Sequence, residues 1–301
     1  MDILQDKVVK LKKKKKAVIL AHNYQISAVQ DIADFIGDSL ELSKISRDLK
    51  EKLIVFCGVR FMAETAKILS PQKKVILPIL DAGCPLADMI TTADLIALKT
   101  RYPEAWVVSY VNSSAEIKAL SDVCCTSANA ITVVKNVPTK QVIFVPDKNL
   151  GWWVAKNVSG KEIILWPGHC LVHEYFTKED VTKSKELHPE AEIMVHPECR
   201  REVIEAVDQV LSTAGMSKAV KNSDKKEFII GTEEGLVYRL KKENPNKTFY
   251  SLGSPKVCMN MKKTTLDDVY RSLDNLKYDI ELDPAIMSKA RLALERMVSY
   301  V

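Results

Sequence analysis

An internal repeat constrains the fold of this 301-residue chain more than any other feature. Four landmarks recur three times each, and successive copies lie 86 or 88 residues apart. They are, in order, a polar aromatic residue that ends an apolar strand (His22, Tyr110 and His196), a small hydroxyl residue before a helix (Ser39, Ser127 and Thr213), an apolar residue in a second strand (Phe56, Phe144 and Ile230) and a cysteine after a further strand (Cys84, Cys170 and Cys258). The shared register predicts three copies of one structural unit.

Within each unit, short apolar strands alternate with segments of helical period. Strands that run into helices are predicted at residues 53–69, 141–157 and 227–243. This alternation is typical of a parallel sheet buried on both faces. We therefore predict an α/β protein with three similar α/β/α domains, whose parallel sheets are arranged around a pseudo-threefold axis with the active site at the centre. The predicted domains are residues 1–85, 86–171 and 172–258.

The C-terminal segment, residues 259–301, departs from the repeat. Thr265 is a suitable N-cap for one helix, and Asp283 followed by Pro284 predicts the start of another. We expect both helices to pack back on the first domain.

The composition is that of a packed globular protein, because 47% of the residues are hydrophobic and 28% are charged. The longest apolar stretches are far shorter than the ~18 residues of a membrane-spanning helix, and the apolar run at residues 17–21 is too short for a signal-peptide core. We expect a cytoplasmic protein without a membrane partner. The lysines of residues 10–16 account for the net charge of +5, and we interpret them as a solvated helix face and not as a nucleic-acid site.

Seven cysteines, without any Cys-x-x-Cys pair, argue against disulfides in a cytoplasmic chain. Proteins with parallel sheets bind their ligands at the carboxyl ends of the strands. If those ends face the common axis, the three repeats bring Cys84, Cys170 and Cys258 to one central site. Three thiolates can hold zinc with an open position or a 4Fe–4S cluster with one open iron, and their number favours neither. The remaining cysteines are interpreted as core or packing residues: Cys57, Cys124, Cys125 and Cys199.

The other landmark residues supply hydrogen-bond donors. The hydroxyls of Ser39, Ser127 and Thr213 are expected at helix N-termini, where backbone N–H groups favour carboxylate or phosphate. Further donors come from the strand ends, namely His22, Tyr110, Asn112 and His196. These groups predict a substrate with several anionic groups. Tyr24 and Glu198 are the acid and base candidates, since a Glu near a metal can take a carbon-bound proton and a Tyr can move protons to oxygen.

Ten motifs, in order along the whole chain, resemble those of the quinolinate synthase family. They are Ala21-His-Asn-Tyr-Gln25, Asp31-Ile-Ala-Asp, Gly37-Asp-Ser, Phe61-Met-Ala-Glu, Tyr110-Val-Asn-Ser, Thr126-Ser-Ala-Asn-Ala, Pro146-Asp-Lys-Asn-Leu-Gly, Gly168-His-Cys, Val195-His-Pro-Glu-Cys and Cys258-Met-Asn-Met-Lys. One local departure is Ser27, where proline is common in the family. Members are iron–sulfur enzymes of de novo NAD biosynthesis. The resemblance implies a transferase that condenses iminoaspartate with dihydroxyacetone phosphate to quinolinate, with loss of phosphate and two waters.

The resemblance also implies roles for individual residues. Cys84, Cys170 and Cys258 match the ligands of a 4Fe–4S cluster whose fourth iron is open and acts as a Lewis acid. The implied substrate-binding residues are His22, Ser39, Tyr110, Asn112, Ser127, His196, Glu198 and Thr213. Tyr24, His196 and Glu198 are the implied catalytic residues. The enzyme that supplies the labile iminoaspartate is the protein partner to consider.

Two other functions stay open on the residues alone. A non-catalytic electron-transfer protein would need a fourth cysteine ligand, and the repeat supplies only three. A zinc hydrolase would use the same thiolates with a carboxylate that activates water, and Glu198 can serve it. His169 and His173 flank Cys170 and are expected to support it, whereas His188 is expected to face solvent.

Overall fold

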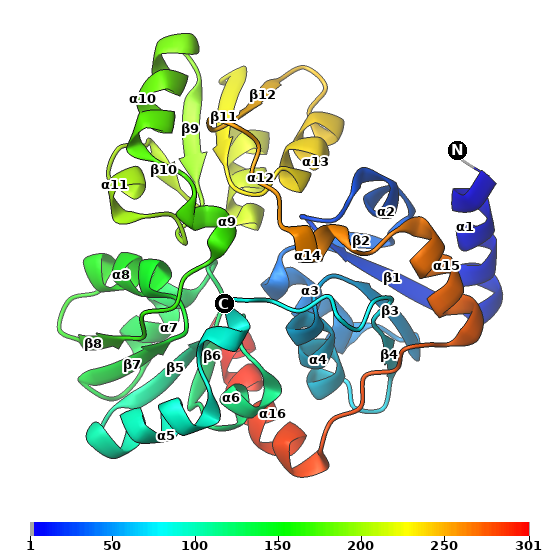
Figure 1. Cartoon of the computed structure of the whole chain (residues 1–301), viewed down its shortest axis with the longest axis horizontal. Helices are drawn as coiled ribbons and strands as arrows, with labels where there is room; N and C mark the ends of the chain where they lie inside the picture. The colour runs from blue at the N-terminus through cyan, green and yellow to red at the C-terminus, as the bar shows by residue number, and fades with distance from the viewer. Residues whose placement is uncertain (1–2, 301) are drawn as a thin grey trace.

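The computed structural model describes residues 3–300 and has three lobes around a common centre (Figure 1). Each lobe is built on a four-stranded parallel sheet. In every sheet the strands lie in the order second, first, third and fourth strand of the repeat. The predicted α/β fold with three similar domains is confirmed, and the predicted boundaries between the domains stay a prediction.

The helices and strands follow one plan in each repeat. The first contains α1 (Ile3–Lys15), β1 (Ala17–His22), α2 (Ser27–Ile32), β2 (Phe35–Gly37), α3 (Ser39–Asp48), β3 (Leu53–Cys57), α4 (Arg60–Leu69) and β4 (Lys74–Ile76). The second contains the 3-10 helix η1 (Ala87–Met89), α5 (Thr92–Arg101), β5 (Trp106–Tyr110), α6 (Ala115–Ala119), β6 (Val123–Cys125), α7 (Ala130–Asn136), β7 (Gln141–Val145), α8 (Lys148–Asn157) and β8 (Glu162–Leu165). The third contains α9 (Leu171–Glu174), α10 (Lys178–Leu187), β9 (Glu192–Val195), α11 (Arg201–Ile204), β10 (Gln209–Val210), α12 (Thr213–Asn222), β11 (Glu227–Gly231), α13 (Gly235–Glu243) and β12 (Thr248–Ser251). The chain ends with α14 (Met259–Lys262), α15 (Leu266–Asn275) and α16 (Pro284–Ser299).

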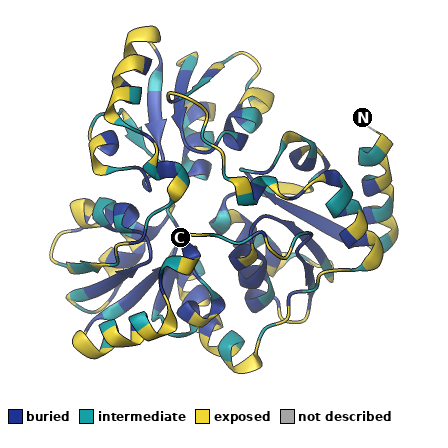
Figure 2. Cartoon of the chain, viewed as in Figure 1, coloured by how far each residue is buried: buried dark blue, intermediate teal, exposed yellow. Residues whose placement is uncertain are grey.

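The central strands are apolar on both faces because helices cover both sides of each sheet. All six residues of β1 are buried, and β3, β5, β7 and β11 are buried from their second residue onward. Figure 2 shows this burial along the strands, with exposed residues on the outer helices. Within residues 3–300, no helix combines the length and the apolar character needed to cross a bilayer.

An aspartate fixes the second strand of every sheet to the first. The carboxylates of Asp34, Asp122 and Asp208 accept hydrogen bonds of 2.8 Å from the backbone N–H groups of Ile19, Val107 and Ile193, respectively. The N–H group of each aspartate donates in return to the carbonyl oxygen of the same strand residue. Both bonds recur in all three repeats, so each unit sets the start of its second strand in the same way.

A lysine caps a helix in every repeat. Lys73, Lys161 and Lys247 donate from Nζ to carbonyl oxygens at the C-terminal ends of α3, α7 and α12, respectively. These carbonyls lack partners within the helix, and a cation also complements the helix dipole there. The lysines are again 88 and 86 residues apart, so they belong to the repeat although the sequence analysis did not identify them.

The C-terminal segment continues the repeat for one more helix. Capping boxes begin α5, α10 and α15, at Thr91, Thr177 and Thr265. These threonines are 86 and 88 residues apart, so the register extends beyond Cys258, where the sequence analysis ended it. Helix α15 packs against α1 and β3 of the first repeat.

The last helix, α16, joins two repeats. It contacts α4 of the first repeat, and α6 and β6 of the second (Figure 1). The side-chain amide of Asn129 donates to the carbonyl oxygen of Met297 at 3.1 Å. Helix α16 therefore lies between the first and second repeats and does not pack on the first repeat alone.

The lysine cluster of α1 includes one buried member. The Nζ atom of Lys12 lies 2.7 Å from a carboxylate oxygen of Asp34 and donates to the carbonyl oxygen of Ile32 at 3.2 Å. The expectation of a wholly solvated lysine face is wrong at Lys12, because this buried charge is paired with the aspartate that fixes β2.

Replacement of Asp122 with Ala tests the contact between the first and second strands. The variant leaves the buried N–H group of Val107 without its acceptor, and such a loss costs ~1–3 kcal/mol. We expect urea denaturation to report a free energy of unfolding lower by that amount. D122N keeps an oxygen acceptor and should lose clearly less. Equal losses in the two variants would show that the negative charge, and not the hydrogen bond, is what matters.

Candidate active site

The carboxyl ends of the three sheets enclose one central cavity. All twelve residues that the sequence analysis selected line it: His22, Tyr24, Ser39, Cys84, Tyr110, Asn112, Ser127, Cys170, His196, Glu198, Thr213 and Cys258. Eight others complete the wall: Asp38, Val59, Phe61, Gly83, Thr126, Val172, His173 and Met261. The structure thus brings the selected residues together, and their individual roles stay predictions.

Strand ends place the first set of polar side chains. His22 and Tyr110 are the last residues of β1 and β5, and His196 directly follows β9. Two positions later, each repeat adds a second polar side chain, namely Tyr24, Asn112 and Glu198. Equivalent backbone positions therefore present a phenol, an amide and a carboxylate in the three repeats.

The hydroxyl residues lie at the next strand ends and link neighbouring repeats. Ser39 and Thr213 are the first residues of α3 and α12, whereas Ser127 lies in the turn before α7. The Thr213 hydroxyl accepts from the side-chain amide of Asn23 at 2.8 Å. The Ser127 hydroxyl lies 3.1 Å from Nε2 of His196. The cavity wall is therefore hydrogen-bonded across repeats.

Two histidines of the cavity are neutral hydrogen-bond donors. The backbone N–H groups of Tyr24 and Glu198 donate to Nδ1 of His22 and His196 at 3.2 and 3.3 Å, respectively. Because a backbone N–H group can only donate, each ring carries its proton on Nε2. Burial lowers the pKa of both histidines to about 3. His22 can thus donate from Nε2 to a ligand without adding charge, whereas the Nε2–H group of His196 faces the Ser127 hydroxyl at 3.1 Å.

Glu198 is a buried carboxylate with one unpartnered oxygen. Its Oε2 lies 2.6 Å from Nδ1 of His173 and 3.5 Å from Nδ1 of His196. Burial raises the pKa of Glu198, but the hydrogen bonds that His173 and Tyr110 make to the carboxylate favour its charged form and lower this pKa below its usual value. Its Oε1 has no hydrogen-bond partner among the residues that the structure describes. This oxygen can accept a proton or a hydrogen bond from a ligand.

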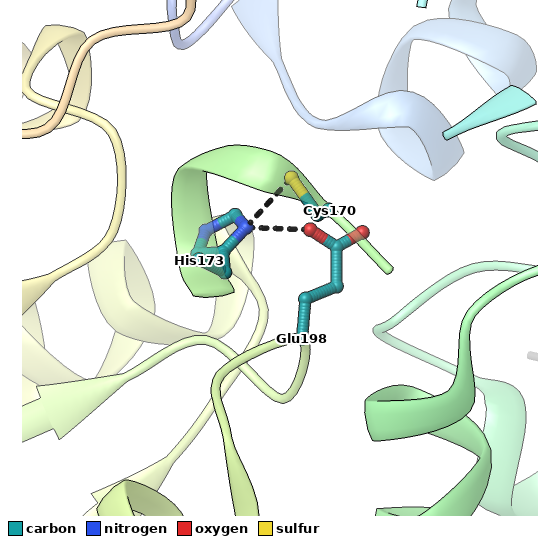
Figure 3. A group of neighbouring side chains, drawn as sticks. All are labelled: Cys170, His173 and Glu198. Atoms are coloured by element: carbon teal, nitrogen blue, oxygen red, sulfur yellow. Dashed lines mark hydrogen bonds and ion pairs between the residues drawn. The ribbon is translucent and has the colours of Figure 1, made fainter. Parts of the chain in front are cut away.

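His173 belongs to the cavity wall, although the sequence analysis expected it only to support Cys170. Its Nδ1 lies 3.3 Å from the sulfur of Cys170, and it also faces Glu198 (Figure 3). Its ring stacks on that of His196 with a centroid distance of 4.5 Å. The signal in the sequence was its position one helical turn after Cys170, which places both side chains on one face of α9.

Thr232 connects His173 to Tyr24 and was also missed. Its Oγ1 lies 2.6 Å from the Tyr24 hydroxyl and 2.8 Å from Nε2 of His173. Burial raises the pKa of Tyr24 well above its usual value, and the charge of Glu198 raises it further. The phenol therefore keeps its proton at neutral pH.

Exposure divides the cysteines into two groups. Cys84, Cys170 and Cys258 are partly exposed, and they line both the central cavity and a second pocket outside it. Burial raises the pKa of all three thiols, to about 12 for Cys84. Such thiols become thiolates only when a metal binds them. The other four are fully buried, as expected for packing residues: Cys57, Cys124, Cys125 and Cys199.

Buried carboxylates accept hydrogen bonds from the backbone of two of the three cavity cysteines. Asp147 accepts from the backbone N–H of Cys170 at 3.1 Å, and Glu233 accepts from that of Cys258 at 3.2 Å. Both acids are 0% exposed and lie two residues after the third strand of their repeat. Val59 occupies this position in the first repeat, so the feature is not shared by all three units.

A second group of metal-ligating atoms overlaps the three cysteines. One atom each of Cys170, His173 and Glu198 lies within 4.8 Å of the others. Thiolate, imidazole and carboxylate are the ligands that zinc prefers. Because Cys170 belongs to both groups, its thiol cannot serve both centres as a terminal ligand.

The two remaining histidines lie outside the cavity wall. His169 precedes Cys170, and its Nδ1 is buried without a hydrogen-bond partner among residues 3–300. His188 is half-buried and stacks on Tyr250 with a centroid distance of 3.6 Å. His188 is therefore only partly exposed, because Tyr250 covers one face of its ring.

The neutral histidines predict how stability depends on pH. Their pKa of about 3 in the folded protein lies below the ~6.5 of the unfolded chain. From ~pH 6.5 to ~pH 4.5, only the unfolded state binds these protons, so the free energy of unfolding falls by up to ~1.4 kcal/mol per pH unit for each histidine. The lowered pKa of Glu198 adds a further loss only below ~pH 4.3.

Urea unfolding of the metal-free protein between these pH values tests this prediction. Wild type should lose stability with falling pH, and H196Q should show a shallower slope. Identical slopes for wild type and H196Q would contradict the neutral state assigned to His196.

Known proteins match this chain over almost its whole length. The family model described as "Quinolinate synthetase A protein" matches residues 6–299. The chain is 54% identical over 298 residues to the quinolinate synthase of Caldicellulosiruptor bescii, which covers 99% of this chain and 98% of that protein. It is 53% identical over 296 residues to that of Thermodesulfovibrio yellowstonii, covering 98% of each. It is 49% identical over 297 residues to quinolinate synthase 2 of Methanosarcina acetivorans, covering 99% of this chain and 96% of that protein. The chain therefore belongs to the quinolinate synthetase A family.

Proposed function

We propose that this protein is a quinolinate synthase of de novo NAD biosynthesis. It condenses iminoaspartate with dihydroxyacetone phosphate and releases phosphate and two waters. The observation that carries the proposal is that the three repeats each contribute a partly exposed cysteine, a hydroxyl and two polar side chains to a single cavity. The family match and the names of the relatives support the same reaction.

Cys84, Cys170 and Cys258 would hold a 4Fe–4S cluster in this cavity. The donor set fits such a cluster, because it consists of three free thiols from three different repeats, all in the same wall. Asp147 and Glu233 hold two of these cysteines through their backbone N–H groups. When bound, the cluster would supply one open iron as a Lewis acid for the dehydration steps.

Neutral donors would bind the anionic groups of the two substrates. None of the residues that line the cavity, within the described chain, is Lys or Arg. Phosphate and carboxylate would therefore be held by hydroxyls and by imidazole N–H groups. Buried oxygens of Asn112 and Glu198 lack partners within residues 3–300 and would bind the polar hydrogens of the substrate.

Glu198 and Tyr24 would divide the proton transfers between them. Glu198 is ionised and therefore acts as the base that removes a carbon-bound proton during isomerisation. A carboxylate with so low a pKa is a weak base, but the neighbouring imine of the substrate acidifies that C–H bond. Tyr24 keeps its proton and therefore acts as the acid that protonates a departing hydroxyl.

A zinc hydrolase is the second candidate function. The close approach of Cys170, His173 and Glu198 favours it, because these three side chains could bind one zinc ion. In that case Glu198 would be a ligand and could not serve as the base. Metal analysis separates the two candidates.

The first test is metal content and activity of protein purified without oxygen. We expect about four irons and four sulfides per chain, and quinolinate formation from the two substrates. C84A, C170A and C258A should each lose most of the iron and all activity. C57A, which changes a fully buried cysteine in β3, should keep both. Stoichiometric zinc without sulfide would overturn the cluster assignment.

A second prediction concerns Glu198. E198Q removes the base and should lower kcat by about 10²- to 10⁴-fold, with the iron content unchanged. The exposed Glu190 is the matched control, and E190Q should be as active as wild type. A kcat for E198Q within threefold of wild type would contradict the assigned role.

A further inference from the structure

Lys118 is a fully buried lysine of the second repeat, and the proposed mechanism does not use it. It lies in α6, and its Nζ atom donates to the carbonyl oxygen of Ser113. Ser113 directly follows Asn112, which lines the central cavity. A lysine ammonium has three protons, whereas a single hydrogen-bond acceptor for Lys118 is found within residues 3–300. Burial of a charge with so few partners destabilises a protein, so this lysine needs a reason beyond the fold.

The first repeat makes the same contact with a neutral side chain. Gln30 lies 88 residues before Lys118. Its Nε2 donates to the carbonyl oxygen of Gln25 at 2.9 Å, and Gln25 in turn lies 88 residues before Ser113. The third repeat has Ile204 at this position, 86 residues after Lys118, and its side chain cannot donate. The repeated fold therefore needs an amide here or no donor at all, and it does not need a positive charge.

The ammonium group of Lys118 lies next to the central cavity. Its Nζ is 5.4 Å from the centre of the Phe61 ring, a distance at which a cation is attracted to the ring. Phe61 lines the cavity, as Asn112 does, and the cavity wall contains no Lys or Arg within the described chain. Lys118 therefore places a positive charge one side chain away from the region where anionic substrates would bind.

Within residues 3–300, no carboxylate forms an ion pair with Lys118. The buried carboxylate of Glu64 pairs with Arg60 at 2.9 Å instead. Burial lowers the pKa of Lys118, and the charge of Glu64 acts in the opposite direction. Because charges interact more strongly in a protein interior than in water, an ammonium without a counterion can attract an anion that enters the cavity.

We propose that Lys118 strengthens the binding of an anionic substrate group, phosphate or carboxylate, beside Asn112 and Phe61. The proposal rests on the proposed function, which supplies two anionic substrates. Lys118 does not line the cavity and would not touch the substrate. It acts across the Phe61 ring and through the segment that carries Asn112, so it is a positioning residue.

The experiment compares K118Q, K118M and K118R in the iron-loaded enzyme. K118Q removes the charge but keeps a donor, since Gln30 shows that a glutamine reaches this carbonyl oxygen. K118M removes both, and K118R keeps the charge. Calorimetry measures the Kd of dihydroxyacetone phosphate and, separately, the Kd of succinate as a stable dicarboxylate.

Loss of the charge should weaken the binding of at least one of these ligands. We expect its Kd to rise about 5- to 30-fold in K118Q and K118M, since one charge several ångströms away changes affinity by this factor at an effective dielectric constant of ~20. The ligand that responds identifies the group, phosphate or carboxylate, that binds beside Lys118. K118R should stay within about threefold of wild type.

Three further measurements separate this role from a structural one. The KM for dihydroxyacetone phosphate or for iminoaspartate should rise with kcat little changed, because the charge stabilises bound substrate and transition state alike. Urea unfolding should show K118Q and K118M to be at least as stable as wild type, because they remove a buried charge. Lys99 is the matched control, since its Nζ donates to the carbonyl oxygen of Leu120 at 2.7 Å outside the cavity wall, and K99Q should bind both ligands like wild type.

Values of Kd in K118Q that match wild type for both ligands overturn the inference. Lys118 would then have only the structural role that Gln30 has in the first repeat. A lower kcat at unchanged KM, or a loss of iron and sulfide from K118Q, also overturns it. A wild-type protein that forms no quinolinate overturns the proposed function, which is a different result from an active wild type with an equally active K118Q.

Discussion

The site depends on one geometric constraint, which is that parallel strands present their carboxyl ends at the same edge of a sheet. The central strands are apolar and buried along most of their length, so the polar side chains that reach the cavity come from residues at and after their carboxyl ends. No single repeat completes the cavity, because each supplies one of the three partly exposed cysteines. Hydrogen bonds between repeats, such as that from the Asn149 amide to the carbonyl oxygen of Glu198 at 3.0 Å, hold the three edges together.

Burial then determines the chemical state of the side chains in the cavity. It keeps His22 and His196 neutral, and it keeps the proton on Tyr24, whereas Glu198 stays ionised because His173 and Tyr110 hydrogen-bond to its carboxylate. A cavity whose wall, within residues 3–300, contains no Lys or Arg is an unusual place for anionic substrates. It is consistent with the proposal that a metal cluster and neutral N–H and O–H donors perform the work that Lys and Arg do elsewhere.

The sequence predicted much of what the three repeats share, since a common period reveals it, although the capping lysines Lys73, Lys161 and Lys247 recur in the same register and were missed. The triplicated α/β fold, the strand-to-helix segments and nine of the cavity residues follow from that period, whereas Tyr24, Asn112 and Glu198 were selected for their chemistry. Residues that occur in only one or two repeats were missed, because a repeat gives no signal for them. His173 aligns with Ala87 and Met261, and Thr232 aligns with Gly58 and Pro146. The placement of α16 was also beyond prediction, because its apolar stripe does not specify which repeat it contacts.

Diffraction at the iron absorption edge, from crystals of the protein grown without oxygen, tests the central claim most directly. The account predicts four iron positions in the central cavity, three of them bonded to the sulfurs of Cys84, Cys170 and Cys258, and a fourth without a protein ligand. A single metal ion bonded to Cys170, His173 and Glu198, with no sulfide, would contradict the account. It would show that the three repeats build a mononuclear site instead of a cluster.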